Sequence, residues 1–198
     1  MKILAKTQRF LKAIKSRNKN LPILEAVHFR KDGAIEASDS HMLLKIEGRN
    51  PSKQDFMLNL NTVTTVEGFY PDTDRLFPED FASEIMVEVN DLRKAIPYMR
   101  ALEEEKSVKG VRVTRTTTGG ITLSQGGANY ELAGEWQTTP AKLDVWLNAK
   151  YIREMCEVFS NNFENASCVT LSFTTDELKP VLAFNDKIKY LITPIRQF

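Results

Sequence analysis

The sequence predicts an α+β fold built from a repeated unit, in which a short strand leads through a polar cap into an amphipathic helix that is followed by alternating strands. The pattern occurs three times along the chain. After each helix the apolar period changes from about 3.6 to about 2 residues, the change expected between a helix and a strand. Each unit is therefore expected to place a helix across a small, mostly antiparallel sheet, and two such units would form one domain.

Each copy shows the same three features: an opening strand, a helix cap and an apolar helix face. In chain order these are "MKILAK", Thr7 and the face Phe10, Leu11, Ile14; "EIMVEV", Asn90 and the face Leu92, Ile96, Met99; and "LDVWL", Asn148 and the face Tyr151, Ile152, Met155, Phe159. Asn and Thr side chains accept hydrogen bonds from the first free amides of a helix, so each helix is predicted to start at these positions.

The strands that follow each helix are predicted in "AVHFRKDGAIEASDSHMLLKIEG", "GVRVTRTTTGGITLSQGGANYELAG" and "CVTLSFTTDELKPVLAFNDKIKYLITPI". Asp32-Gly33, Gly119-Gly120 and Asn185-Asp186 supply the hairpin turns. The first unit ends near Gly48, and too little chain remains before Ser83 for a second complete unit. We therefore expect a shortened amino-terminal domain over 1–82 and a complete domain over 83–198.

Composition indicates a folded soluble protein, with 42% hydrophobic and 27% charged residues in 198 residues and 22.6 kDa. Cys156 and Cys168 form no CxxC pair and are too few for a disulfide framework, so a reducing cytoplasm is expected. No stretch reaches the ~20 apolar residues of a membrane span, and the amino terminus lacks a signal-type apolar core.

Net charge is only +1, but the cations are unevenly distributed, because all the charged residues before Glu25 are Lys or Arg. Each of the three predicted helices has Lys or Arg residues outside its apolar face. In chain order of the helices they are Arg9, Lys12, Lys15 and Lys19; Arg93, Lys94 and Arg100; and Lys150 and Arg153. Helices side by side would form a cationic surface that attracts phosphates without reading sequence. The alternative is a set of solvated helix faces, and Glu154 and Glu157 dilute the third.

Ordered segments of the chain resemble the bacterial DNA polymerase III β subunit, the sliding clamp. They are "TQRFLKAIKSRNKNLPILEAVHF", "IEASDSHMLLKI", "EGFYPDTDRLFP", "EEEKSVKGVRV", "WLNAKYIREMCEVF", "TTDELKPVLAF" and "YLITPIR", and together they cover residues 1–48 and about 68–198. The resemblance implies the DNA-clamp fold, with helices packed on antiparallel sheets, and no catalytic activity.

The resemblance also implies a hydrophobic groove that binds short linear motifs of partner proteins. The segment "EGFYPDTDRLFP" resembles the linker that leads into the third clamp domain. The carboxy-terminal side of the groove would be Leu191, Ile192, Thr193, Pro194, Ile195 and Arg196, and its linker side would be Pro71, Arg75 and Leu76. Two features depart from the family. Thr193 stands where Met is usual, which makes the slot more polar, and the chain runs on to Phe198, whose ring could fill part of the groove.

Clamps of this family have three domains per chain and close as dimers, whereas this chain is expected to have at most two. Three copies would give six domains around a hole, so a homotrimeric ring is favoured. The expected partners are double-stranded DNA, and a DNA polymerase and clamp-loader type proteins that bind through linear motifs; no cofactor or membrane contact is expected. The alternative is a clamp-derived decoy or regulator that binds clamp partners without encircling DNA.

Other possible sites are weak. Asp39, Ser40 and His41 are triad residue types, but neighbours in a strand point to opposite faces and cannot form the relay. Asp72 and Asp74 have a spacing seen in Mg²⁺ sites and leave a metal-dependent nuclease as a third reading, although a turn beside Pro71 explains them. The two histidines, His28 and His41, lack further zinc ligands, and neither GxGxxG nor a P-loop is present.

Overall fold

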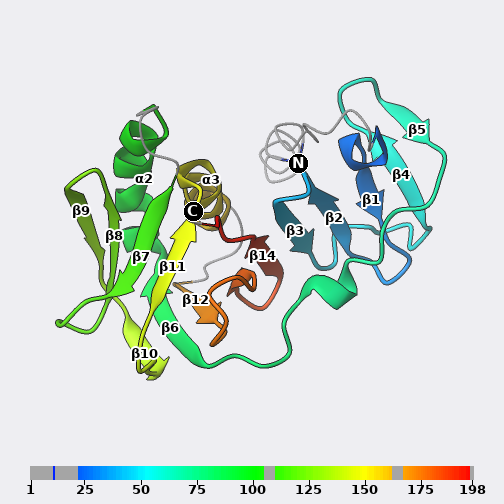
Figure 1. Cartoon of the computed structure of the whole chain (residues 1–198). Coiled ribbons are helices and arrows are strands. Elements are labelled where there is room, and N and C mark those ends of the chain that lie inside the picture. Colours follow the sequence, from blue (N-terminus) through cyan, green and yellow to red (C-terminus); the bar gives the residue numbers. More distant parts are fainter. Residues whose placement is uncertain (1–10, 12–21, 105–109, 162–166, 197–198) are drawn as a thin grey trace. The chain divides into compact units, whose positions relative to one another are not determined.

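A computed structural model describes residues 11, 22–104, 110–161 and 167–196, and Figure 1 shows the chain with its elements labelled. The chain divides into two compact units. The first comprises Met1–Arg75 and Asp186–Leu191, and the second comprises Leu76–Asn185 and Ile192–Phe198. The predicted α+β class is confirmed, because the described residues combine α-helices with antiparallel strand pairs. The division at 82/83 stays a prediction.

The elements follow one another along the chain in the order of their numbers. In the first unit they are η1 (Pro22–Glu25), β1 (Val27–Phe29), β2 (Ile35–Ser38), β3 (Met42–Ile46), β4 (Phe56–Asn59), β5 (Thr64–Val66) and most of β14 (Ile188–Ile192), with η2 (Asp74–Leu76) at the boundary. In the second unit they are β6 (Ser83–Glu88), α2 (Val89–Glu104), β7 (Val111–Arg115), β8 (Ile121–Gln125), β9 (Ala128–Leu132), β10 (Glu135–Thr138), β11 (Asp144–Leu147), α3 (Ala149–Asn161), β12 (Cys168–Phe173) and β13 (Val181–Phe184).

The first unit is built on one sheet with the strand order β14-β3-β2-β1-β4-β5. Strand β2 pairs antiparallel with β1 and β3, in a register that places Glu36 opposite both His28 and Lys45. β2 and β3 are buried along their whole length, on both faces. The apolar positions of these strands form the core, and the polar positions of the other face meet the linker, as described below.

Two strands of this sheet were not foreseen from the sequence. β4 and β5 lie in the stretch after Gly48, where the sequence predicts no element; β4 pairs antiparallel with β1 and with β5. The short strands, with exposed residues in β5, carry a weak alternation that does not stand out in the sequence. The predicted first helix lies outside the described residues, except for Leu11, which is helical and buried.

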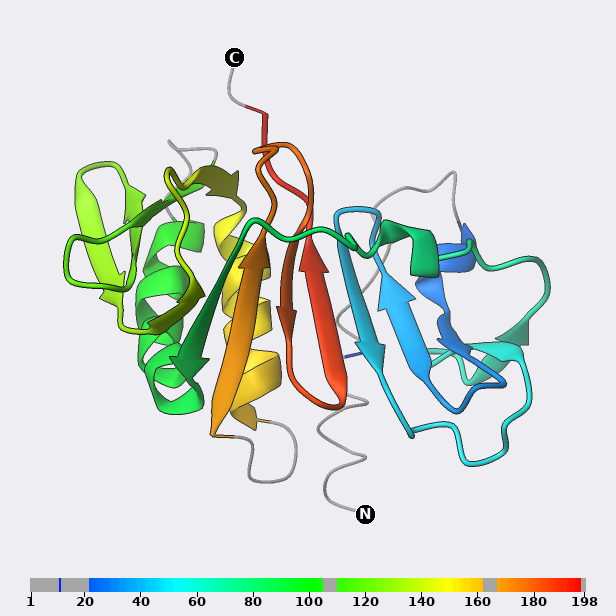
Figure 2. The ribbon, with the colours of Figure 1, turned by 90° about the horizontal axis from the view of Figure 1, so that it is seen from below.

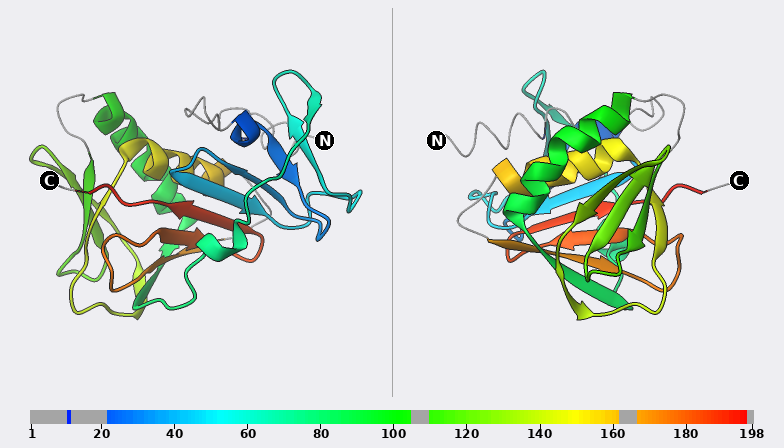
Figure 3. Two further views of the ribbon diagram at one scale, coloured as in Figure 1. Left: turned by 45° about the vertical axis from the view of Figure 1, so that its right-hand side comes forward. Right: turned by 90° about the vertical axis from the view of Figure 1, so that its left-hand side faces the viewer.

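The second unit contains two layers of strands and two helices. One sheet runs β11-β7-β8-β9, and the strands β10-β6-β12-β13 are neighbours in the other. Helices α2 and α3 run side by side, as the views from below and from the side agree (Figures 2 and 3). The two strand–helix units predicted over this region are therefore both present.

The helix predictions are confirmed in detail for α3 and with small shifts for α2. Asn148 caps α3, since its side-chain oxygen accepts a hydrogen bond from the amide of Lys150 at 2.9 Å. The predicted apolar face of α3 is buried. Helix α2 begins at Val89, one residue before the predicted cap Asn90, and its buried residues are Leu92, Ala95, Met99 and Leu102, while Ile96 is only half-buried.

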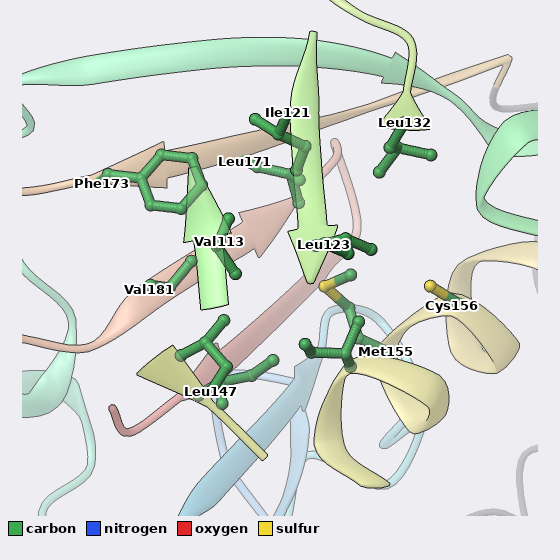
Figure 4. Close-up of a pocket in the computed structure, with 12 residues that line it drawn as sticks. Val113, Ile121, Leu123, Leu132, Leu147, Met155, Cys156, Leu171, Phe173 and Val181 are labelled. Atoms are coloured by element: carbon green, nitrogen blue, oxygen red, sulfur yellow. The ribbon is translucent and has the colours of Figure 1, made fainter. Parts of the chain in front are cut away.

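The core of the second unit is apolar and nearly filled. Side chains from both layers and from α3 converge on it, including Val113, Leu123, Met155, Leu171 and Phe173 (Figure 4). The space left between them is about 20 Å³, about enough for a single water molecule. The core holds the helix pair at a fixed distance from the sheets, and so sets which helix faces remain outside.

Candidate functional site

The predicted phosphate-binding cations of the second unit fall into two groups by exposure. Arg93, Lys94 and Arg100 of α2 are exposed, with side-chain exposures of 71% for Lys94 and 63% for Arg100. Lys150 and Arg153 of α3 are largely covered, at 19% and 16%. The structure therefore brings cations of both helices to one helix pair but leaves only those of α2 open to a large ligand.

Each of these cations is engaged by a neighbour within the helix pair. Lys94 Nζ lies 2.7 Å from Asp91 Oδ1, and Arg100 Nη2 lies 2.8 Å from Glu157 Oε1 on α3. Arg93 donates to the carbonyl oxygen of Ser160 at 3.0 Å. Exposed pairs of this kind are screened by solvent and contribute little to stability, so phosphates can compete with the carboxylates for the same cations.

Arg153 is a structural link between the two helices. Its Nε donates to Glu103 Oε2 of α2 at 2.6 Å, and its Nη1 lies 2.9 Å from Glu157 Oε2. Burial works against the charged guanidinium, but the hydrogen bond to Glu103 and the charge of Glu157 outweigh it and raise the pKa of Arg153. The sequence predicts that the side chain of Arg153 faces outward, whereas the structure places it between α2 and α3.

The helix pair is electrically balanced. α2 carries three cations and three carboxylates, and α3 carries two of each. On α2 and α3 the predicted cations are therefore interspersed with an equal number of carboxylates. The remaining predicted cations, Arg9, Lys12, Lys15 and Lys19, lie outside the described residues.

The carboxy-terminal segment is attached to the second unit. The amide of Ile195 donates to the carbonyl oxygen of Trp146 in β11 at 2.7 Å. A methyl group on Gly110 would come within 3.1 Å of Ile195 Cδ1, so the side chain of Ile195 packs directly on that glycine. Leu191 and Ile192 are buried at the end of β14, whereas Thr193, Pro194 and Ile195 are half-buried and Arg196 is exposed.

The linker residues predicted for the groove are open to solvent. Pro71 is exposed, and the side chains of Arg75 and Leu76 show 86% and 49% exposure. Pro71, Arg75 and Leu191 belong to the first unit, while Leu76 and the segment after Leu191 belong to the second. An exposed leucine is the kind of surface that an apolar peptide side chain covers.

The first unit contains a polar row that the sequence analysis missed. His28, Glu36 and Lys45 stand opposite one another on three neighbouring strands, and Arg30 follows His28 at the strand spacing of two. Glu36 is fully buried, and His28 Nδ1 contacts its Oε1 at 2.7 Å. The signal available in the sequence was the polar alternate positions in "VHFR", "IEAS" and "LLKI", but only the strand register brings them together.

The row borders an open cavity of about 530 Å³ and is covered on one side by the linker. Thr73 Oγ1 donates to Glu36 Oε2 at 2.6 Å. Asp74 accepts from Arg30 Nη2 at 2.7 Å and from Lys45 Nζ at 3.0 Å. Figure 2 shows η2, at the end of this linker, beside the ends of β2 and β3.

His28 and Asp74 of this cluster have shifted pKa values. Burial alone would lower the pKa of His28, but hydrogen bonds to Glu36 and Asp55 outweigh it and raise the pKa. The hydrogen bond from Arg30 lowers the pKa of Asp74, against the opposing effect of burial, and Lys45 lowers it further. His28 is therefore more basic, and Asp74 more acidic, than in an unfolded chain.

The weaker candidate sites of the sequence analysis are a turn and an ion pair in the structure. Asp39, Ser40 and His41 are not neighbours in a strand, as assumed above, but form the turn between β2 and β3, where Asp39 Oδ1 accepts from the amides of His41 and Met42. Asp72 is paired with Arg75 at 2.8 Å.

Among the residues that the structure describes, no three His, Cys, Asp or Glu side chains form a metal-binding group, and no helix is long and apolar enough to cross a membrane.

Comparisons with known proteins identify the fold. No protein-family model matches the sequence, and no curated protein sequence matches it. Among solved structures, the DNA polymerase III beta chain of Streptococcus pneumoniae superposes with a TM-score of 0.76 at 23% identity, over 99% of this chain and 63% of that one. The DNA polymerase sliding clamp of Bacillus subtilis gives a TM-score of 0.74 at 19% identity, over 100% of this chain and 63% of that one.

A third similar structure contains a ligand. It is a sliding clamp from Bartonella birtlesii bound to griselimycin, with a TM-score of 0.75 and 15% identity over 98% of this chain and 65% of that one. The DNA-clamp fold implied by the sequence resemblance is thus confirmed. The chain spans less than two thirds of the length of these clamps.

Proposed function

We propose that this chain, which has the fold of bacterial sliding clamps in a shortened form, is a clamp-type processivity factor that encircles duplex DNA and tethers a polymerase without being an enzyme itself. The observation that carries the proposal is the superposition of nearly the whole chain on clamp structures. A topological link requires only weak contacts with DNA, because the ring cannot fall off a closed duplex. The exposed cations of α2 suit such contacts.

The DNA contacts are proposed to be sequence-independent. Arg93, Lys94 and Arg100 supply the exposed cations of the second unit, and the amino-terminal cations Arg9, Lys12, Lys15 and Lys19 supply unbalanced positive charge. Lys150 and Arg153 contribute less, since their side chains are largely covered. Binding should weaken as salt rises, because phosphate contacts release counterions.

The partner groove is proposed at the linker and the carboxy-terminal segment. Its linker side is Pro71, Arg75 and Leu76; its terminal side is Leu191, Ile192, Thr193, Pro194, Ile195 and Arg196. The exposure of Leu76 and the fixed backbone of Ile195 support this assignment. A polymerase and clamp-loader type proteins would dock there through linear motifs. Griselimycin is bound by a clamp of similar fold, and we propose this groove as its site on the present chain.

Solution mass is the first test of the ring. Light scattering on a sizing column should give three times 22.6 kDa, about 68 kDa, if three copies form a homotrimeric ring. A mass that stays near 22.6 kDa at high protein concentration would contradict an autonomous ring.

Retention on DNA tests encirclement itself. Protein loaded on a nicked circular plasmid should co-elute with it at moderate salt and be released when a restriction enzyme linearises the plasmid. Equal retention on circular and linear DNA would mean that the contact is not topological. A variant in which Arg9, Lys12 and Lys15 are replaced by Glu should lose retention on the circular plasmid.

A decoy or regulator that binds clamp partners without encircling DNA is the second candidate. The charge balance of α2 and α3 favours it, because these helices lack the net positive charge of a strong phosphate-binding surface. The same triple charge reversal separates the two candidates. A decoy would keep its affinity for griselimycin and lose no function, whereas a clamp would keep that affinity and lose DNA retention.

A further inference from the structure

We propose that Thr73 and Asp74 are positioning residues for the partner groove: they fasten the linker to the polar row of the first unit, so that Pro71 and Arg75 are presented in one conformation. The inference rests on the proposed function, because the groove is what the fixed linker would serve. It assigns a role to the side chains that hold the linker on the sheet of the first unit.

Asp74 joins two separate parts of the sheet. Its carboxylate accepts two hydrogen bonds from Arg30, at 3.2 and 2.7 Å, in the forked geometry that is typical of strong guanidinium–carboxylate pairs. The same carboxylate accepts from Lys45 Nζ at 3.0 Å. Arg30 directly follows β1 and Lys45 lies in β3, so one side chain of the linker is held from two strands that flank β2.

Thr73 provides the second attachment. It is 2% exposed, and its hydroxyl donates to Glu36 at 2.6 Å. Glu36 has no exposure and also contacts His28 and Arg30. Burying a carboxylate costs free energy unless several hydrogen-bond donors satisfy it. Removing the Thr73 hydroxyl would take one donor from Glu36 and should lower the stability of this attachment.

The two attachments lie immediately before Arg75. Asp72 also orders this stretch, since its carboxylate accepts from the amide of Asp74 at 3.3 Å and pairs with Arg75 Nε at 2.8 Å. The side chain of Arg75 nevertheless keeps 86% exposure. The backbone is therefore held from within the first unit while the guanidinium remains open to a ligand.

A linker held in one conformation binds more tightly than a mobile one, because the cost of ordering it is met during folding and not during binding. Loss of this preorganisation should weaken a ligand of the groove by roughly three- to tenfold, which corresponds to the cost of ordering one or two side chains. A role confined to the stability of the first unit would leave that affinity unchanged in protein that is still folded.

The test uses the full chain and compares Asp74→Asn and Thr73→Val with Asp55→Asn. Asp55 is a matched control, because it is also a half-exposed carboxylate of the first unit, at 57% against 52% for Asp74, and it pairs with His28 and not with Arg30 or Lys45, the two cations that hold Asp74. Amide hydrogen exchange of segment 70–76 reports the attachment of the linker, and titration with griselimycin reports the groove. Exchange of β2 and β3 amides shows whether each variant is folded.

We expect faster exchange in segment 70–76 and weaker griselimycin binding for Asp74→Asn and Thr73→Val, with both properties unchanged for Asp55→Asn. Unchanged exchange in the linker would overturn the attachment, and faster exchange with unchanged affinity would overturn the positioning role. Wild-type protein that binds no griselimycin would instead refute the groove in the proposed function, and the positioning role with it. Wild-type binding that the variants retain would refute only the inference about Thr73 and Asp74.

Discussion

Replacing Glu157 by Gln should strengthen binding to duplex DNA. Glu157 holds Arg100 at 2.8 Å and also contacts Arg153 at 2.9 Å, and its side chain is 22% exposed. The substitution removes one negative charge from a balanced helix pair and releases Arg100, while Arg153 keeps its 2.6 Å bond to Glu103. The helix pair should therefore stay packed, with one cation freed.

The size of the effect follows from the pair that is removed. An exposed ion pair contributes about 0.2–1 kcal/mol. Without Glu157, Arg100 can bind a phosphate without first breaking that pair, so the affinity for DNA should rise by a factor of roughly 1.4 to 5. If Arg100 gains one phosphate, the slope of log affinity against log salt should steepen by about 0.9. Between 50 and 200 mM salt, that is a further loss of roughly threefold compared with wild type.

Fluorescence anisotropy with a labelled duplex of arbitrary sequence, at four or five salt concentrations, measures both quantities. Glu131→Gln is the matched control, because it makes the same change of charge at an exposed residue of β9 in the same unit. Equal slopes for wild type and Glu157→Gln would refute the idea that α2 meets phosphates. An equal gain in both variants would mean that net charge alone acts.

Four further outcomes are expected. Arg153→Met should lower the free energy of unfolding by about 1–3 kcal/mol in a denaturant titration but barely change DNA affinity, because the side chain links two helices; a large loss of affinity in folded protein would argue against this. The contribution of His28 to stability should be fully present below its unfolded pKa of about 6.5 and be lost as pH rises through its raised pKa, so His28→Gln should flatten that decline in denaturant titrations across this range; an unchanged pH profile would count against the cluster. Gly120→Ala should destabilise by about 1–3 kcal/mol in a thermal melt, since the new methyl group would lie 2.3 Å from the carbonyl oxygen of Leu132; an unshifted melting temperature would contradict the close approach. Burial raises the pKa of the Cys156 thiol to about 12, so a thiol reagent at pH 8 should label it only after unfolding, and rapid labelling of native protein would refute its burial.

The sequence predicted the parts of the fold that depend on local pattern. The cap at Asn148 and the buried face of α3 follow from spacing within a dozen residues, and the structure has both. The same spacing predicted that Arg153 faces outward, which is wrong, because its partner Glu103 lies 50 residues away on another helix. Periodicity identifies the apolar side of a helix but not which neighbouring helix covers its flank.

Contacts that depend on strand register were beyond the sequence analysis. His28, Glu36 and Lys45 become neighbours only when three strands pair in one register, and Asp74 reaches them from 29 residues beyond Lys45. Asp74 was therefore considered as a possible metal ligand, whereas its carboxylate accepts hydrogen bonds from Arg30 and Lys45. The resemblance to clamps supplied the groove residues, and it could not supply what holds their backbone in place.

The attachment of the carboxy-terminal segment to β11 also limits unwanted self-association. β11 ends the order of its sheet, and such a strand offers free amides and carbonyls that can template growth with another chain. The hydrogen bond from the Ile195 amide to the Trp146 carbonyl occupies part of that sheet edge. A chain lacking its last few residues should thus be more prone to aggregate, in addition to any loss of partner docking.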